Sequence, residues 1–99
     1  AHRLNEAREV IDRGVAQGES VRLLALLGDL NYSEENHQAA REAFSRCVEL
    51  DAQYARGWLM GGYCSLELGD NAEARRFLQR AAEFPGQKKL ANDLLKRIP

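Results

Sequence analysis

The chain has few side chains that could carry out covalent or metal chemistry, and their spacing keeps them apart. Its thiols are Cys47 and Cys64, which form no CxxC motif, and its histidines are His2 and His37. A catalytic thiol needs a histidine beside it, and isolated cysteines and histidines lack the spacing of metal ligands. No glycine-rich phosphate loop and no nucleophile motif occurs. The residues therefore predict a protein that is not an enzyme and holds no metal or cofactor.

The environments of these side chains can also be predicted. Free cysteine is among the most buried residue types, so we expect Cys47 and Cys64 to be buried, inert thiols. A disulfide between them stays open, because their predicted helices should be neighbours. His37 falls in the first turn of a predicted helix, where a positive charge is unfavourable, so we expect a neutral surface residue.

Length and composition describe an ordinary folded domain. The chain has 99 residues, of which 44% are hydrophobic and 29% charged, which predicts one domain and no disorder. The net charge of −1 removes the overall basic footprint of a nucleic-acid binder. No apolar run reaches the roughly 18 residues of a membrane span. We expect a cytoplasmic chain, with a periplasmic or membrane-tethered parent protein left open.

Helix-forming residues dominate, and the residues that favour strands are scarce. Ala, Leu, Glu, Arg and Gln are common, threonine is absent, and the only prolines are Pro85 and Pro99. Asn36 and Asp70 are suitable N-caps, and Asp70 with Glu73 has the spacing of a capping box. The pattern predicts an all-α chain. Apolar periodicity and the glycine and polar breaks place helices at 3–16, 20–33, 36–50, 54–68, 70–84 and 87–97.

The chain repeats itself with a period of 34 residues. This shift aligns Gly28 with Gly62 and Ala40 with Ala74, and it places each predicted helix on another without a gap. The repeating unit is a pair of antiparallel helices, 21–54 and then 55–88.

On these residues the chain resembles the tetratricopeptide repeat family. The family's large residues fall on Leu24, Trp58, Phe44 and Leu78, and its small ones on Gly28, Gly62, Ala40, Ala74, Cys47 and Ala81. Gly61 departs from the pattern, as do Asn31 and Ser65, which stand where the family has tyrosine. The resemblance implies one domain over 1–99, an α–α superhelix of helical hairpins. Residues 1–20 would be the second helix of a partial preceding repeat, and 87–99 a capping helix whose Leu90, Leu94 and Leu95 cover helix 70–84.

The resemblance also implies a concave groove, lined by the first helix of each unit, that binds a peptide or helix of a partner protein. The residues expected to face this groove are Arg22, Leu26, Asp29, Tyr32, Arg56, Leu59, Met60, Tyr63 and Glu67. For the leucines, packing between helices is the alternative. The lysines and asparagines with which some members clamp a C-terminal carboxylate are absent.

Arginines gather on the second helices, at Arg41, Arg46, Arg75, Arg76 and Arg80. Helical spacing pairs Glu42 with Arg46, Arg46 with Glu49, and Arg80 with Glu83, which predicts a solvated, salt-bridged convex face. A phosphate- or RNA-binding ridge is the alternative, but no aromatic residues are interleaved with these arginines.

Together these features predict a non-catalytic interaction module or scaffold, co-chaperone-like, whose partner is a protein or peptide. The alternative is a structural repeat segment that mediates oligomerisation through its exposed ends. An RNA-binding repeat and an enzyme have less support from the residues.

Overall fold

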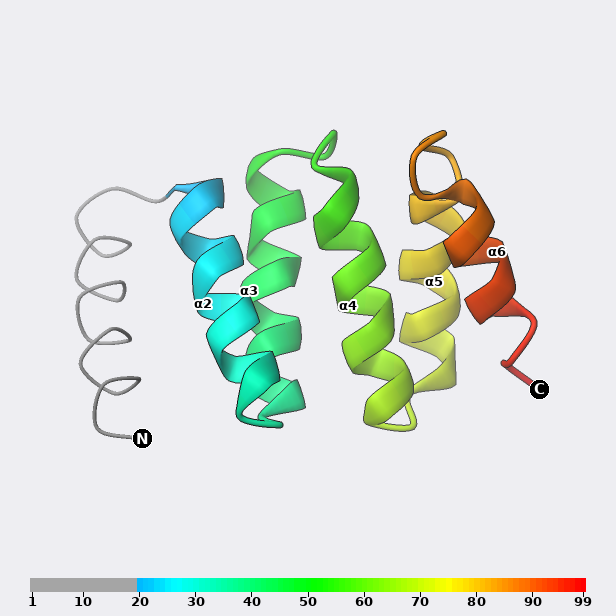
Figure 1. Cartoon of the computed structure of the whole chain (residues 1–99), viewed down its shortest axis with the longest axis horizontal. Coiled ribbons are helices and arrows are strands. Elements are labelled where there is room, and N and C mark those ends of the chain that lie inside the picture. Colours follow the sequence, from blue (N-terminus) through cyan, green and yellow to red (C-terminus); the bar gives the residue numbers. More distant parts are fainter. Residues whose placement is uncertain (1–19) are drawn as a thin grey trace.

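The computed structural model describes residues 20–99, which form five α-helices and no strand (Figure 1). The predicted all-α fold is confirmed. Every predicted helix in this part of the chain is present, with its ends shifted by no more than a few residues. The helix predicted at 3–16, and with it the partial repeat, lies outside the described residues. The helices are α2 (Val21–Ser33), α3 (His37–Leu50), α4 (Ala55–Glu67), α5 (Asn71–Ala81) and α6 (Lys88–Leu95).

Side-chain caps start three of these helices. Ser20, Asn36 and Asp70 each accept a hydrogen bond from a backbone N–H three residues on, at 3.4, 3.4 and 3.2 Å. The predicted capping box forms only in part, because Glu73 binds Arg76 at 2.9 Å and the N–H of Asp70 donates to the carbonyl of Ser65 at the end of α4. The helix predicted to reach residue 84 ends at Ala81, and the N–H groups of Glu83 and Phe84 then bond to carbonyls three residues back. Phe84 precedes Pro85, and the residue before a proline is disfavoured in α-helical geometry.

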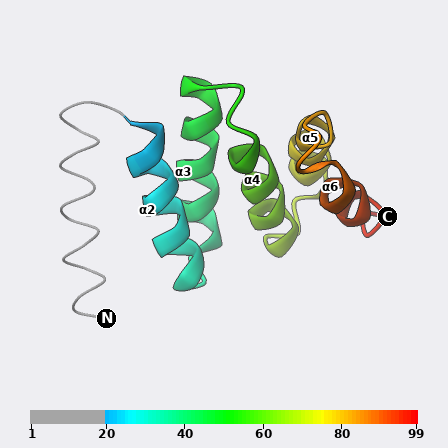
Figure 2. The same ribbon diagram turned by 45° about the horizontal axis from the view of Figure 1, so that its top comes forward.

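The helices stack in chain order, each packed against its neighbours in sequence (Figures 1 and 2). α2 with α3 forms one hairpin, α4 with α5 the next, and α3 against α4 joins them. Small residues allow the close approach within each hairpin. A Cβ at Gly28 would lie 2.7 Å from the Phe44 ring, and one at Gly62 would lie 2.6 Å from Leu78. Ala40 and Ala74 are fully buried, as the repeat pattern predicts.

Gly61, the atypical residue of the second repeat, makes room for an aromatic ring. A Cβ at this position would overlap the ring of Phe77, which is 2% exposed and lies edge-on to Trp58. The 34-residue shift maps Gly61 and Phe77 onto Leu27 and Ala43. In the second repeat the large residue of this pair therefore stands on the second helix of the hairpin instead of the first. Phe77 fills the space that the missing side chain at Gly61 leaves.

α6 packs on α5 through Ala91 and Leu94, which are both buried in the same cluster as Phe77 and Leu78. Leu95 is half-buried against this cluster. Leu90 differs from the prediction, because it is 43% exposed and does not cover α5.

Candidate functional site

Four of the predicted groove residues line a single cavity beside the first helices of the two repeats. Arg22, Leu26 and Asp29 reach it from α2, and Arg56 reaches it from α4. The cavity has a volume of about 640 Å³ and is otherwise lined by Val21, Leu23, Ala25 and Tyr54. Its wall is mostly apolar, and three charged side chains also line it. We call it the α2–α4 cavity.

An ion pair crosses the α2–α4 cavity. The Nη2 of Arg56 lies 2.6 Å from the Oδ1 of Asp29, with side chains that are 43% and 41% exposed. The hydrogen bond to Asp29 raises the pKa of Arg56 above its ordinary value. The guanidinium also lies 5.8 Å from the centre of the Phe44 ring. Arg22 is exposed, and no residue in the described part of the chain forms an ion pair with it.

The other predicted groove residues of α4 do not share one environment. Met60 and Tyr63 are half-buried, and Glu67 is exposed at the end of the helix. Leu59 is only 7% exposed and belongs to the core with α5, which agrees with packing between helices, the alternative that the sequence left open for the leucines. Its counterpart one repeat earlier, Ala25, is also buried, at 6% exposed, although it lines part of the α2–α4 cavity.

Tyr32 lies at the opposite end of α2 from the α2–α4 cavity. It is half-buried, and its ring meets that of His37 at 5.4 Å in an edge-on arrangement. Burial raises the pKa of Tyr32, and the negative charge of Glu67 raises it further. His37 was expected on the surface, but it is half-buried, because its ring packs against this tyrosine.

Two further residues were not among the predicted groove residues. Tyr54, the N-cap residue of α4, lines the α2–α4 cavity although it lies in the turn before the helix. Leu90 falls, by the 34-residue shift, at the place of Arg22 and Arg56, and its 43% exposure agrees with that position. Extending the repeat by one more helix would have identified Leu90, whereas no local signal points to Tyr54.

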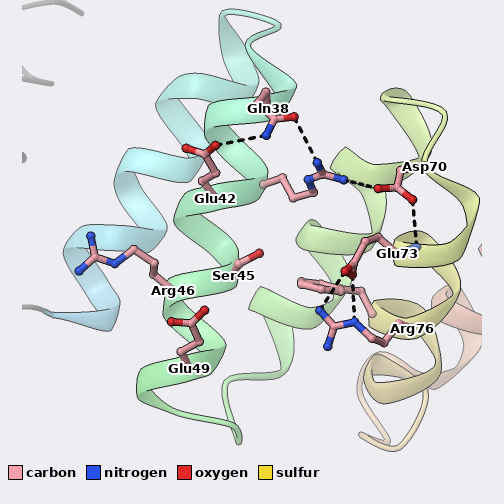
Figure 3. Close-up of a pocket in the computed structure, with 10 residues that line it drawn as sticks. Gln38, Glu42, Ser45, Arg46, Glu49, Asp70, Glu73 and Arg76 are labelled. Atoms are coloured by element: carbon pink, nitrogen blue, oxygen red, sulfur yellow. Dashed lines mark hydrogen bonds and ion pairs between the residues drawn. The ribbon is translucent and has the colours of Figure 1, made fainter.

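A second, polar hollow of about 560 Å³ lies between α3 and α5 (Figure 3). Arg41 binds Asp70 at 2.9 Å across the two helices, and Arg76 binds Glu73 at 2.9 Å within α5. The predicted pair of Arg80 with Glu83 is present at 3.0 Å. These arginines are therefore held by carboxylates, which agrees with a salt-bridged face and disfavours a phosphate-binding ridge.

The surroundings of the two thiols do not activate either of them as a nucleophile. Cys47 and Cys64 are both free and fully buried, as expected, so the open question of a disulfide is answered. Burial raises the pKa of each thiol to about 11, which keeps both protonated and unreactive at neutral pH. Within residues 20–99 no group of histidines, cysteines and carboxylates could hold a metal ion, and no helix is long and apolar enough to cross a membrane.

Comparison with known proteins agrees with this fold. Two solved structures of SycD, a type III secretion chaperone of Yersinia enterocolitica, share the fold at 22% sequence identity. One, in complex with a peptide of the translocator YopD, has a TM-score of 0.85, with 98% of this chain and 80% of SycD covered. The other has a TM-score of 0.82, with 98% and 72% covered. No curated protein matches the sequence. The tetratricopeptide repeat model matches residues 32–98, so this chain belongs to the tetratricopeptide repeat family.

Proposed function

We propose that this chain is a non-catalytic interaction module that binds a peptide or helix of a partner protein on its concave side. The observation that carries this proposal is the α2–α4 cavity, where apolar side chains and three charged groups meet on the first helices of two successive repeats. The likeness to SycD supports it, since that fold has been captured with a peptide of a partner protein.

The apolar part of the cavity favours a side chain as ligand. Leu26 is 48% exposed although it is large and apolar, and it stands beside Val21 and Leu23. An exposed apolar surface with a polar rim is typical of protein-binding sites. Met60 and Tyr63 on α4 do not line the cavity but are half-buried, so each leaves part of its side chain open to a ligand that follows the next helix.

Charge favours one orientation of a bound segment. Arg22 lies in the first turn of α2 and Arg56 in the first turn of α4, whereas Glu67 is the last residue of α4. The two ends of the concave side therefore differ in charge. A segment with apolar anchors would bind with its acidic part near Arg22 and its basic part near Glu67.

A peptide library displayed on phage and selected on the whole chain tests this proposal. Binding of the selected peptides is then measured for Leu26→Ala, Tyr63→Ala and the control Leu50→Ala. Leu50 is a matched control, because it is 47% exposed but lies at the end of α3, outside the cavity. We expect Leu26→Ala and Tyr63→Ala to weaken binding at least several-fold and the control to leave it unchanged.

Three results would contradict the proposal. The library yields no peptide, or Leu50→Ala weakens binding as much as Leu26→Ala does, or Arg76→Ala on the convex side abolishes binding that Tyr63→Ala retains. Sedimentation at several concentrations accompanies these measurements. Self-association that is lost in Leu26→Ala, with no peptide selected, would favour the structural, oligomerising alternative.

A further inference from the structure

We infer that Asp29 competes with a ligand's carboxylate for Arg56 in the α2–α4 cavity, which makes the site specific for an apolar side chain next to a single carboxylate. This inference rests on the proposed function and names the chemistry of its ligand. Arg22 would bind the ligand's carboxylate, while Asp29 occupies Arg56 and excludes a second one.

The geometry of the ion pair is the first argument. Arg56 and Asp29 both line the cavity, and their charged groups lie 2.6 Å apart across the two helices. A guanidinium binds a carboxylate through a charge-assisted hydrogen bond, and here Asp29 already accepts that bond. The contact joins one nitrogen of Arg56 to one oxygen of Asp29, so other N–H groups of the guanidinium remain, but the charge of Arg56 is already balanced and an incoming carboxylate there would meet the carboxylate of Asp29 beside it.

The charge of the cavity is the second argument. Its lining holds two cations, Arg22 and Arg56, and one anion, Asp29, for a net charge of +1. One carboxylate at Arg22 neutralises the site. A second carboxylate would enter a neutral site and approach Asp29, where like charges repel.

The repeat itself provides the third argument, because the ion pair has no counterpart at the next junction. The 34-residue shift maps Asp29 onto Tyr63 and Arg56 onto Leu90. The places on α4 and α6 that correspond to the ion pair therefore hold an aromatic and an aliphatic residue. The pair is also about two-fifths exposed, and ion pairs of this kind contribute little to stability. A role in specificity accounts for it better than a role in the fold.

Synthetic peptides with a central leucine, followed by no aspartate, one or two, test this inference. Each is made with a C-terminal acid and with a C-terminal amide, so that a side-chain carboxylate is distinguished from a terminal one. Dissociation constants are measured by fluorescence polarisation for the wild type, for Asp29→Asn and for the control Asp93→Asn. Asp93 is an exposed carboxylate of α6 that does not line the cavity.

In the wild type, the first aspartate should strengthen binding and the second should add nothing. Asp29→Asn frees Arg56, so it should bind the peptide with two aspartates about tenfold more tightly than the wild type does, which is about 1.4 kcal/mol. The affinity of Asp29→Asn for the neutral peptide, which has no aspartate and a C-terminal amide, should not change. Asp93→Asn should behave like the wild type. In Asp29→Asn with Arg56→Gln, the gain should disappear.

The inference is wrong if Asp29→Asn binds the peptide with two aspartates no better than the wild type does, while the neutral peptide still binds. It is also wrong if the gain persists in the double variant or appears equally in Asp93→Asn. In these cases the proposed function stands. If none of these peptides binds any variant and phage selection also yields none, the proposed function itself is contradicted. Melting curves of all variants show whether each remains folded.

Discussion

Replacing Gly61 by alanine should destabilise the chain, although alanine is the better helix former by about 1 kcal/mol. A Cβ at Gly61 would overlap the ring of Phe77. This ring is 2% exposed, lies 5.4 Å from the Trp58 ring, and is covered by the Arg76 guanidinium at 4.6 Å. Since the ring has little room to move, overpacking should cost about 3 kcal/mol, for a net loss of about 2 kcal/mol.

A double variant tests the same packing from the other side. Phe77→Ala by itself should cost about 3–5 kcal/mol, because it leaves a cavity beside Gly61. Gly61→Leu combined with Phe77→Ala recreates the Leu27 and Ala43 combination of the first repeat. The double variant should therefore be more stable than the sum of the single effects predicts, by about 2 kcal/mol.

Urea unfolding followed by circular dichroism measures these changes in the free energy of unfolding. In thermal unfolding, each kcal/mol corresponds to about 4–8 °C in melting temperature for a domain of this size. Gly86→Ala is the control, because a Cβ there meets no atom within 4 Å. Its stability should match that of the wild type. If Gly61→Ala resists urea as well as or better than the wild type, the Phe77 ring has room and the reasoning is refuted.

Three further predictions concern the turns and the last helix. Asp70 caps α5 and binds Arg41, and its pKa is lowered mainly by the hydrogen bond from the Glu73 N–H and then by Arg41. This contribution to stability should be present above the ordinary pKa of 3.8 and be lost as the pH falls through the lower pKa of the folded state. When stability is measured against pH in acid, Asp70→Ala should show a smaller decline than the wild type. Glu35 has a φ of 61° at the place where the next repeat has Gly69 at 75°. Glu35→Gly should therefore raise the free energy of unfolding by up to about 1 kcal/mol, and an unchanged or lower melting temperature would argue against strain at this turn. Removing residues 87–99 should uncover the buried face of α5 and cause aggregation or lower helicity, whereas a truncated chain that is monomeric and equally stable would show that α6 is not a cap.

The sequence by itself determined the helices and the repeat. Apolar periodicity and the caps Asn36 and Asp70 are local signals, so they predicted where helices begin. The 34-residue shift predicted which helices form hairpins, because buried small residues such as Ala40 and Ala74 leave space that only a neighbouring helix can fill. These features depend on residues close in sequence or related by the repeat, and they could be predicted without coordinates.

Only the tertiary structure decided which side chains of the first helices are accessible and how their charges pair. Leu26 is 48% exposed and Leu59 is 7% exposed, although both are leucines at adjacent places in the repeat, because burial depends on the helix that packs against each. The Asp29–Arg56 ion pair joins residues from two repeats, and no rule of helical spacing links them. The specificity proposed for the cavity depends on that pair, because a charge is available to a ligand only if no neighbour in three dimensions has already neutralised it.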